Sequence, residues 1–151
     1  MSVLRNKICS RSLFLLIIAL LYISVFSGCA SSVRYKNEIF ELVEKKKEVL
    51  LADIAENDFT DSLMFERIET VEVLDYCVNF CCGGYGVSAS SHEFGFYYSF
   101  DDQPLGVWDD TEFCLSEGLS ETGNGFSGDF QHNSYYTEKI CDYFWYYELH
   151  F

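Results

Sequence analysis

The amino-acid sequence predicts an α+β domain in which one N-terminal helix packs on a meandering antiparallel sheet of about four strands. One segment has apolar residues at helical spacing, later segments alternate apolar and polar residues, and the connections are of hairpin length. The chain has 151 residues, of which 49% are hydrophobic and 18% aromatic. It is therefore long enough for one domain and far too apolar to be a disordered chain.

The N-terminus has the layout of a signal peptide. Arg5, Lys7 and Arg11 precede an apolar run, SLFLLIIALLYISVF. At about 15 residues, the run is shorter than the ~20 residues that cross a bilayer as a helix. The run leads into FSGC, which resembles the lipobox of bacterial lipoproteins because small residues directly precede Cys29.

The lipobox resemblance implies cleavage after Gly28 and a diacylglyceryl group on the thiol of Cys29, although Phe26 departs from the usual aliphatic residue. Two acyl chains suffice for stable attachment, here at the extracytoplasmic face of the cell membrane. An uncleaved signal anchor and secretion with an incidental cysteine are the alternatives. We expect three segments: a lipoprotein signal peptide over 1–28, a tether over 29–34 and a single α+β domain over 35–151.

The charge of the mature chain limits its partners. The whole chain has 10 basic and 24 acidic residues, and cleavage after Gly28 removes three basic ones, so the formal charge becomes 7 − 24 = −17. Such a chain cannot neutralise phosphates, which argues against nucleic acid and against docking on anionic lipid. A cationic protein or peptide is an allowed partner, and a solvated acidic surface is the alternative.

A helix is predicted over residues 35–57. Glu41 and Lys45, four residues apart, form a favourable surface pair. Such a helix packs on its own sheet or binds a partner helix. Its apolar stripe consists of Ile39, Val43, Leu50 and Ile54, widened by Phe40, Leu42 and Leu51.

The rest of the chain predicts strands, because its apolar residues recur with period two. The first of these segments is predicted to carry two faces: one with Leu74, Tyr76, Val78, Phe80 and Cys82, and the other with Val73, Asp75, Cys77, Asn79 and Cys81. Residues 101–110 are predicted to be a turn, residues 118–134 a glycine-rich polar loop, and residues 135–140 either strand or helical turn. The four predicted strands are residues 70–82, 92–100, 112–118 and 140–151.

The segment CCGGYGVSASSH combines cysteines, glycines and a histidine, the residue types of a catalytic or metal site. Its glycines lie between two predicted strands, which favours a tight turn. No Lys-Ser/Thr and no helix follow, so it is not a phosphate loop. With no C-x-x-C pair and no paired histidines, we expect neither a metal site nor a cofactor.

The disulfide state of the cysteines stays open. Cys77 and Cys81 are four residues apart on one predicted strand, about 13 Å, which is too far for a disulfide. Cys114 or Cys141 bridging one of them is one possibility, and buried thiols packed as small apolar residues are the other. Five mature cysteines beside Cys29 leave at least one thiol unpaired within a single chain: Cys77, Cys81, Cys82, Cys114 and Cys141.

Three further groups of residues suggest chemistry. Cys82 with His92 could form a hydrolase site, although no local signature of a cysteine protease is present. The four carboxylates of DDQPLGVWDD lack the spacing of a calcium loop, which favours a solvated turn. Tyr143, Trp145 and Tyr147 could stack on carbohydrate, but alternating aromatic residues on a strand are more often core.

The segments CCGGYGVSASSHEFGFYYSFDDQPLGV and YYTEKICDYFWYYE resemble small lipoproteins of Gram-positive bacteria. The resemblance implies a bacterial cell-surface location and brings no activity with it. We therefore expect a lipid-anchored extracytoplasmic domain with a binding or structural role and no catalytic residues. The alternatives are a hydrolase using Cys82 and His92, and an acidic lipoprotein that neutralises a cationic toxin or peptide. The oligomeric state cannot be predicted.

Overall fold

The computed structural model describes residues 32–86, 91–108, 112–115, 119–130 and 133–151. The chain forms two compact units, 1–35 and 36–151. Only residues 32–35 of the first unit are described, and they are helical, as are residues 36–56 of the second. The helix was predicted over 35–57, so the last described residues of the expected tether are helical as well.

The end of the helix is fastened to a short 3-10 turn, η1 (Ser62–Met64). Asp53 is 7% exposed, and its carboxylate accepts hydrogen bonds from the backbone N–H of Ser62 at 2.7 Å and from its hydroxyl at 2.5 Å. A buried carboxylate needs such donors, because its burial without hydrogen bonds would cost ~2 kcal/mol or more.

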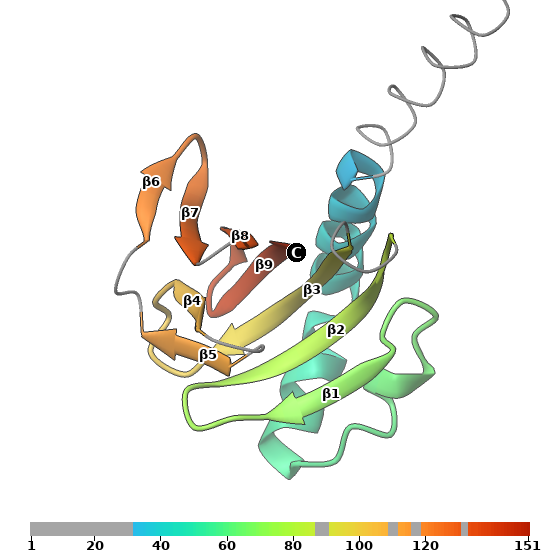
Figure 1. Cartoon of the computed structure of the whole chain (residues 1–151). Helices are drawn as coiled ribbons and strands as arrows, with labels where there is room; N and C mark the ends of the chain where they lie inside the picture. Colours follow the sequence, from blue (N-terminus) through green and yellow to red (C-terminus); the bar gives the residue numbers. More distant parts are fainter. Residues whose placement is uncertain (1–31, 87–90, 109–111, 116–118, 131–132) are drawn as a thin grey trace, which may run out of the picture. The chain divides into compact units, whose positions relative to one another are not determined.

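A seven-stranded antiparallel sheet forms the centre of the second unit, with the order β1-β2-β3-β9-β8-β7-β6 (Figure 1). A separate two-stranded sheet consists of β4 and β5. Thus β1 to β3 and β6 to β9 each form a meander, and the pairing of β3 with β9 joins the two. The strands are β1 (Thr70–Val73), β2 (Cys77–Tyr85), β3 (His92–Ser99), β4 (Leu105–Trp108), β5 (Glu112–Leu115), β6 (Ser120–Thr122), β7 (Gly125–Phe130), β8 (Asn133–Cys141) and β9 (Phe144–His150).

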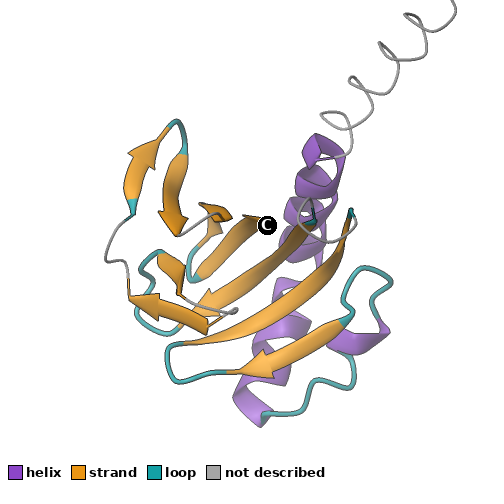
Figure 2. Ribbon diagram, in the orientation of Figure 1, coloured by secondary structure: helices purple, strands orange, loops and turns teal. Residues whose placement is uncertain are grey.

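The helix packs on one face of this sheet, as predicted (Figure 2). Its residues Ile39, Val43 and Leu50 are fully buried. The ring of Phe40 lies 5.9 Å from that of Tyr146 on β9, between centroids. Three of the four predicted stripe residues are therefore core, and the fourth, Ile54, is half-buried. The burial of this stripe is part of what holds the helix in place.

The other face of the sheet is also covered, which the sequence did not predict. The backbone N–H of Leu105 on β4 donates to the hydroxyl of Tyr97 on β3 at 2.9 Å. Four consecutive residues are buried on β3 and again on β9, as expected of strands that are covered on both faces. The core cluster on this side consists of Cys77, Tyr97, Leu105, Tyr135, Trp145, Tyr147 and Leu149.

The prediction of about four strands in one meander is wrong, because two predicted strands are each interrupted by a turn. The segment 70–82 bends at residues 74–76, between β1 and β2. The C-terminal segment turns at Asp142 and Tyr143, between β8 and β9. The predicted turn over 101–110 contains β4, and the predicted loop over 118–134 contains β6 and β7. Residues 135–140, predicted to be either strand or helical turn, belong to β8.

Among the described residues, no helix has both the length and the apolar character needed to cross a membrane.

Candidate functional site

Three turns meet at one end of the sheet: β1–β2, β3–β4 and β8–β9. The backbone N–H of Phe100 donates to the carbonyl of Tyr76 at 3.1 Å, which joins the first two turns. The N–H of Ser99 donates to the carbonyl of Tyr143 at 2.8 Å, which joins the second and third. We call this end the turn surface and define it by the side chains of Asp75, Tyr76, Tyr98, Phe100, Asp101, Asp102, Asp142 and Tyr143.

Each of the three turns exposes an aromatic ring. Tyr76 is 46% exposed, Phe100 48% and Tyr143 42%. These are three of the seven large hydrophobic residues that are exposed in the described part of the chain. Single exposed apolar residues are ordinary, whereas a cluster of them marks an interaction surface.

An aspartate lies next to each exposed ring in the sequence. Asp75 precedes Tyr76, Asp101 follows Phe100, and Asp142 precedes Tyr143, and all three carboxylates are exposed. The turn surface therefore repeats one chemical unit, a ring beside a carboxylate, three times. Both halves of this unit attract cations, the ring through its quadrupole and the carboxylate through its charge.

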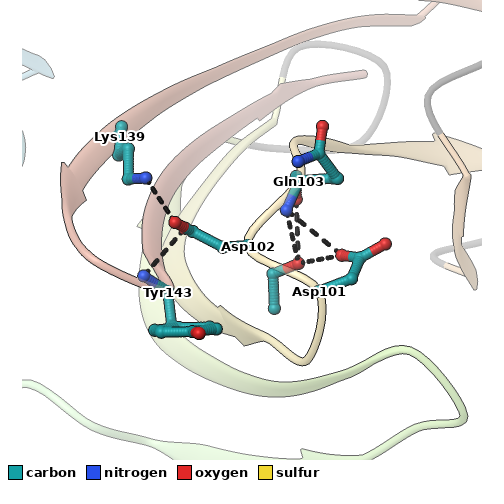
Figure 3. A network of polar contacts seen from close by, with 6 residues as sticks. Asp101, Asp102, Gln103, Lys139 and Tyr143 are labelled. Carbon is teal, nitrogen blue, oxygen red and sulfur yellow. Dashed lines mark hydrogen bonds and ion pairs between the residues drawn. The ribbon is translucent and has the colours of Figure 1, made fainter.

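A network of polar contacts holds the second and third turns together (Figure 3). Asp102 accepts from the Nζ of Lys139 at 2.6 Å and from the backbone N–H of Tyr143 at 2.8 Å. On the other side of the turn, Asp101 accepts from the hydroxyl of Ser99 at 2.8 Å and from the backbone N–H of Gln103 at 3.1 Å. The turns are therefore held in place before any partner binds.

Lys139 is the cation of this network. Burial would raise the pKa of Asp102, but the hydrogen bonds from Lys139 and from the N–H of Tyr143 outweigh it and hold that pKa below its ordinary value. The ammonium of Lys139 also lies 5.5 Å from the ring centroid of Trp145. The turn surface has four aspartates, and among the ion pairs of the described residues only Asp102 is paired with a lysine.

The opposite end of β2 and β3 contains a pocket of about 310 Å³. It is built largely from the CCGGYG segment, which was predicted to be a tight turn. Instead, β2 continues to Tyr85, and Gly83 and Gly84 lie within the strand at a β-bulge. The pocket is lined by Glu69, Cys81, Gly83, Gly84, Tyr85, Gly86, Ser91, His92, Glu93 and Phe151.

The structure brings Cys81, not Cys82, to the same pocket as His92. Cys82 is 3% exposed, and its Sγ lies 3.8 Å from the carbonyl oxygen of Phe80. The ring of His92 stacks on Tyr85 at 4.7 Å and meets His150 edge-on at 4.4 Å. Cys82 and His92, suggested by the sequence as a hydrolase site, therefore lie apart: Cys82 is in the core and His92 lines the pocket.

The thiol in the pocket lacks the character of a nucleophile. Burial raises the pKa of Cys81, and the charges of Glu93 and Glu69 raise it further, against a hydrogen bond from the Gly83 N–H. The Sγ of Cys81 donates to the Glu93 carboxylate at 3.7 Å. Reactive cysteines have lowered pKa values and positively charged surroundings, so this pocket has the opposite electrostatics.

Two of the other cysteines, Cys77 and Cys82, are buried and serve as small apolar residues. Cys77, Cys81, Cys82 and Cys141 are free thiols. Burial raises the pKa of Cys77 to about 12, and it also raises that of Cys82. Cys114 lies in β5, and Cys29 lies outside the described residues.

The remaining predicted site residues divide between core and surface. Trp145 and Tyr147 are 5% and 0% exposed, so they belong to the core, and only Tyr143 of that stripe is exposed. Two of the four carboxylates of DDQPLGVWDD, Asp101 and Asp102, are in the turn network, and the other two lie outside the described residues. Within the described ranges, no three His, Cys, Asp or Glu side chains come together as metal ligands.

Comparison of the chain with protein-family models, with curated proteins and with solved structures finds no match.

The sequence did not predict the turn surface, because Tyr76 and Tyr143 fit the period-two pattern of the strands predicted over 70–82 and 140–151. A signal was nevertheless present. The dipeptide Asp-Tyr occurs at 75–76 and at 142–143, and aspartate is depleted in strands. Reading aspartate as a break in both segments would have located two of the three turns.

Proposed function

We propose that this chain is a lipid-anchored extracytoplasmic binding domain, and that its turn surface binds a cationic segment of a protein or peptide. The observation that carries the proposal is the threefold repetition of an exposed ring beside an exposed aspartate, on turns joined by hydrogen bonds. Charge alone would not require the rings. Rings beside carboxylates suit a positive group that also carries apolar surface.

The chain's own Lys139 supports this assignment. Its ammonium is held by the Asp102 carboxylate and lies over the Trp145 ring, so this end of the sheet already binds one cation by the combination proposed. A partner would use the ring and carboxylate pairs that Lys139 does not occupy. The formal charge of −17 expected for the mature chain would speed the approach of a cationic partner.

The proposed anchor is the lipid on Cys29. The FSGC motif and the basic and apolar segments before it support the anchor. Cys29→Ala should release the protein from membranes or leave it as an unprocessed precursor. Palmitate labelling and membrane fractionation of the full chain measure this, and retention of a labelled Cys29→Ala protein after cleavage at Gly28 would contradict lipidation there.

Matched charge variants test the binding proposal. One variant carries Asp75→Asn, Asp101→Asn and Asp142→Asn, where asparagine keeps a side-chain acceptor for the turn network. The control carries Glu48→Gln, Glu56→Gln and Asp61→Asn, three exposed residues outside the turn surface, and loses the same charge. The probe is a peptide of alternating lysine, arginine and glycine residues, titrated calorimetrically into the full chain in detergent.

We expect the turn-surface variant to bind this peptide about tenfold more weakly than the parent, since three exposed charge pairs of ~0.5 kcal/mol each are lost. The control variant should bind within about twofold of the parent. Equal weakening in both variants would show that overall acidity, rather than the turn surface, attracts the peptide.

A further inference from the structure

We infer that the turn surface selects arginine over lysine, so that its partner is a segment bearing guanidinium groups. This inference rests on the proposed function and names the chemistry of the partner. It depends on three features of the surface: the arrangement of its rings, the position of its carboxylates and the occupation of its one lysine site.

The rings of the turn surface form a short ladder. Tyr98 and Tyr143 stack with centroids 5.5 Å apart and planes inclined by 21°. Phe100 meets Tyr98 nearly edge-on, at 6.1 Å and 65°. Tyr98 is partly buried, so it supports the two outer rings, which are about half exposed. The surface thus offers planar apolar area, on which a flat and weakly hydrated guanidinium stacks better than a compact, strongly hydrated ammonium.

Each carboxylate is the sequence neighbour of a ring. Asp142 directly precedes Tyr143, and Asp101 directly follows Phe100. A guanidinium stacked on a ring keeps all five of its N–H donors in its own plane, parallel to the ring, where they stay available to a neighbouring carboxylate in a two-point contact. An ammonium has no such plane and must give up either the ring or part of its hydration.

The site that suits an ammonium is already occupied. Lys139 donates to Asp102 at 2.6 Å, and Asp102 also accepts from the N–H of Tyr143 at 2.8 Å. Asp102 is therefore committed to holding the turns together. A lysine of the partner would find only exposed aspartates, where an ion pair stabilises a complex little because water screens it.

Three hexapeptides titrated into the full chain in detergent test the inference: hexa-arginine, hexa-lysine and hexa-citrulline. Citrulline has the shape of arginine but no charge. We expect hexa-arginine to bind about tenfold more tightly than hexa-lysine, and hexa-citrulline to bind more weakly than both. The preference should persist in Tyr143→Phe, which keeps the ring, and shrink to about twofold in Tyr143→Gly.

Each outcome decides between the two proposals. Equal affinity for hexa-arginine and hexa-lysine overturns the inference and leaves the proposed function standing, whereas no binding of either overturns both. Binding of hexa-citrulline as tight as that of hexa-arginine, or binding of an N-acetylglucosamine trimer in place of the cationic peptides, assigns the rings to a neutral ligand and overturns both proposals. An arginine preference that is unchanged in Tyr143→Gly places the selective contacts elsewhere and overturns the inference.

Discussion

The two ends of β2 and β3 both contain residues with positive φ angles, but the residue types that adopt them differ. At the pocket end, glycines take the positive φ angles, with Gly83 at +86° and Gly86 at +114°. At the turn surface, Asp102 and Tyr143 take them, at +58° and +68°. Glycine adopts such angles without strain, whereas a residue with a side chain pays roughly 1–2 kcal/mol.

The difference indicates what each end is for. The pocket end uses the residue type that its backbone demands. The turn surface keeps an aromatic side chain at a position where glycine would be more stable, and Asp102 holds the N–H of that residue in place. Local rules are broken most often where a side chain has a function outside the fold, which is why we assign recognition to the turn surface.

The largest effect that this comparison predicts is at the pocket end. A Cβ on Gly84 would lie 2.0 Å from the carbonyl oxygen of His92, a backbone atom that cannot move aside. Gly84→Ala should therefore lower the free energy of unfolding by about 3 kcal/mol. Gly123→Ala is the control, because Gly123 has a φ of +61° and no atom within 4 Å of such a Cβ, and it should lose only about 1 kcal/mol. Equal losses in urea denaturation would contradict the close packing at Gly84.

A smaller effect separates the two neighbouring thiols. Cys82→Ser places a hydroxyl in the core and should cost about 2 kcal/mol, whereas Cys81→Ser, at the pocket, should be nearly neutral. Thermal melting of both variants measures this, together with the thiol reactivity of the parent. A fully stable Cys82→Ser protein and an unusually reactive Cys82 in the parent would restore the hydrolase interpretation.

Acid should weaken the pocket end before the turn surface. Burial, and then the charge of His150, lower the pKa of His92, against the opposing charge of Glu148. The unfolded chain therefore binds a proton near pH 6.5, where folded His92 does not, and stability is lost as the pH falls through that value. The lowered pKa of Asp102 gives a contribution that lasts until the pH falls below 3.8.

His92→Gln isolates the contribution of this histidine. Between pH 7.5 and pH 5, the melting temperature of the parent should fall further than that of His92→Gln. Asp102→Asn should behave like the parent over that range and differ from it only in stronger acid. Parallel pH profiles for the parent and His92→Gln would contradict the assignment to His92.

The predictable part of the fold was the part that follows from periodicity. The helix and its buried stripe follow from helical spacing, and the helix-facing side of β2 follows from alternation. The predicted number of strands was wrong because several turns were not recognised. Gly123-Asn124 is a two-residue hairpin turn inside the segment predicted to be a loop, and the Asp-Tyr turns lack the glycine that usually marks a hairpin.

The candidate site was less predictable than the fold. Its rings and aspartates come from three turns that are far apart in the sequence, and they meet only because β3 pairs with both β2 and β9. No local spacing encodes that pairing, whereas the residues of CCGGYG are adjacent in the sequence and can be recognised as a candidate site without it. That segment does line a pocket, but the pocket's thiol is Cys81, because the bulge in β2 decides which side chains face it.

The substitution Tyr143→Gly tests the central claim most directly, because it relieves a positive φ and removes an exposed ring of the turn surface at the same position. Glycine relieves the positive φ, so the free energy of unfolding should stay the same or rise by up to about 1 kcal/mol. The same protein should lose most of its affinity for a lysine- and arginine-containing peptide, because the ring that is 42% exposed is gone. Unfolding and peptide binding are measured on one preparation of the full chain. Stability unchanged or raised with binding lost is the result we predict, and stability lost with binding unchanged would show that the ring serves the fold instead.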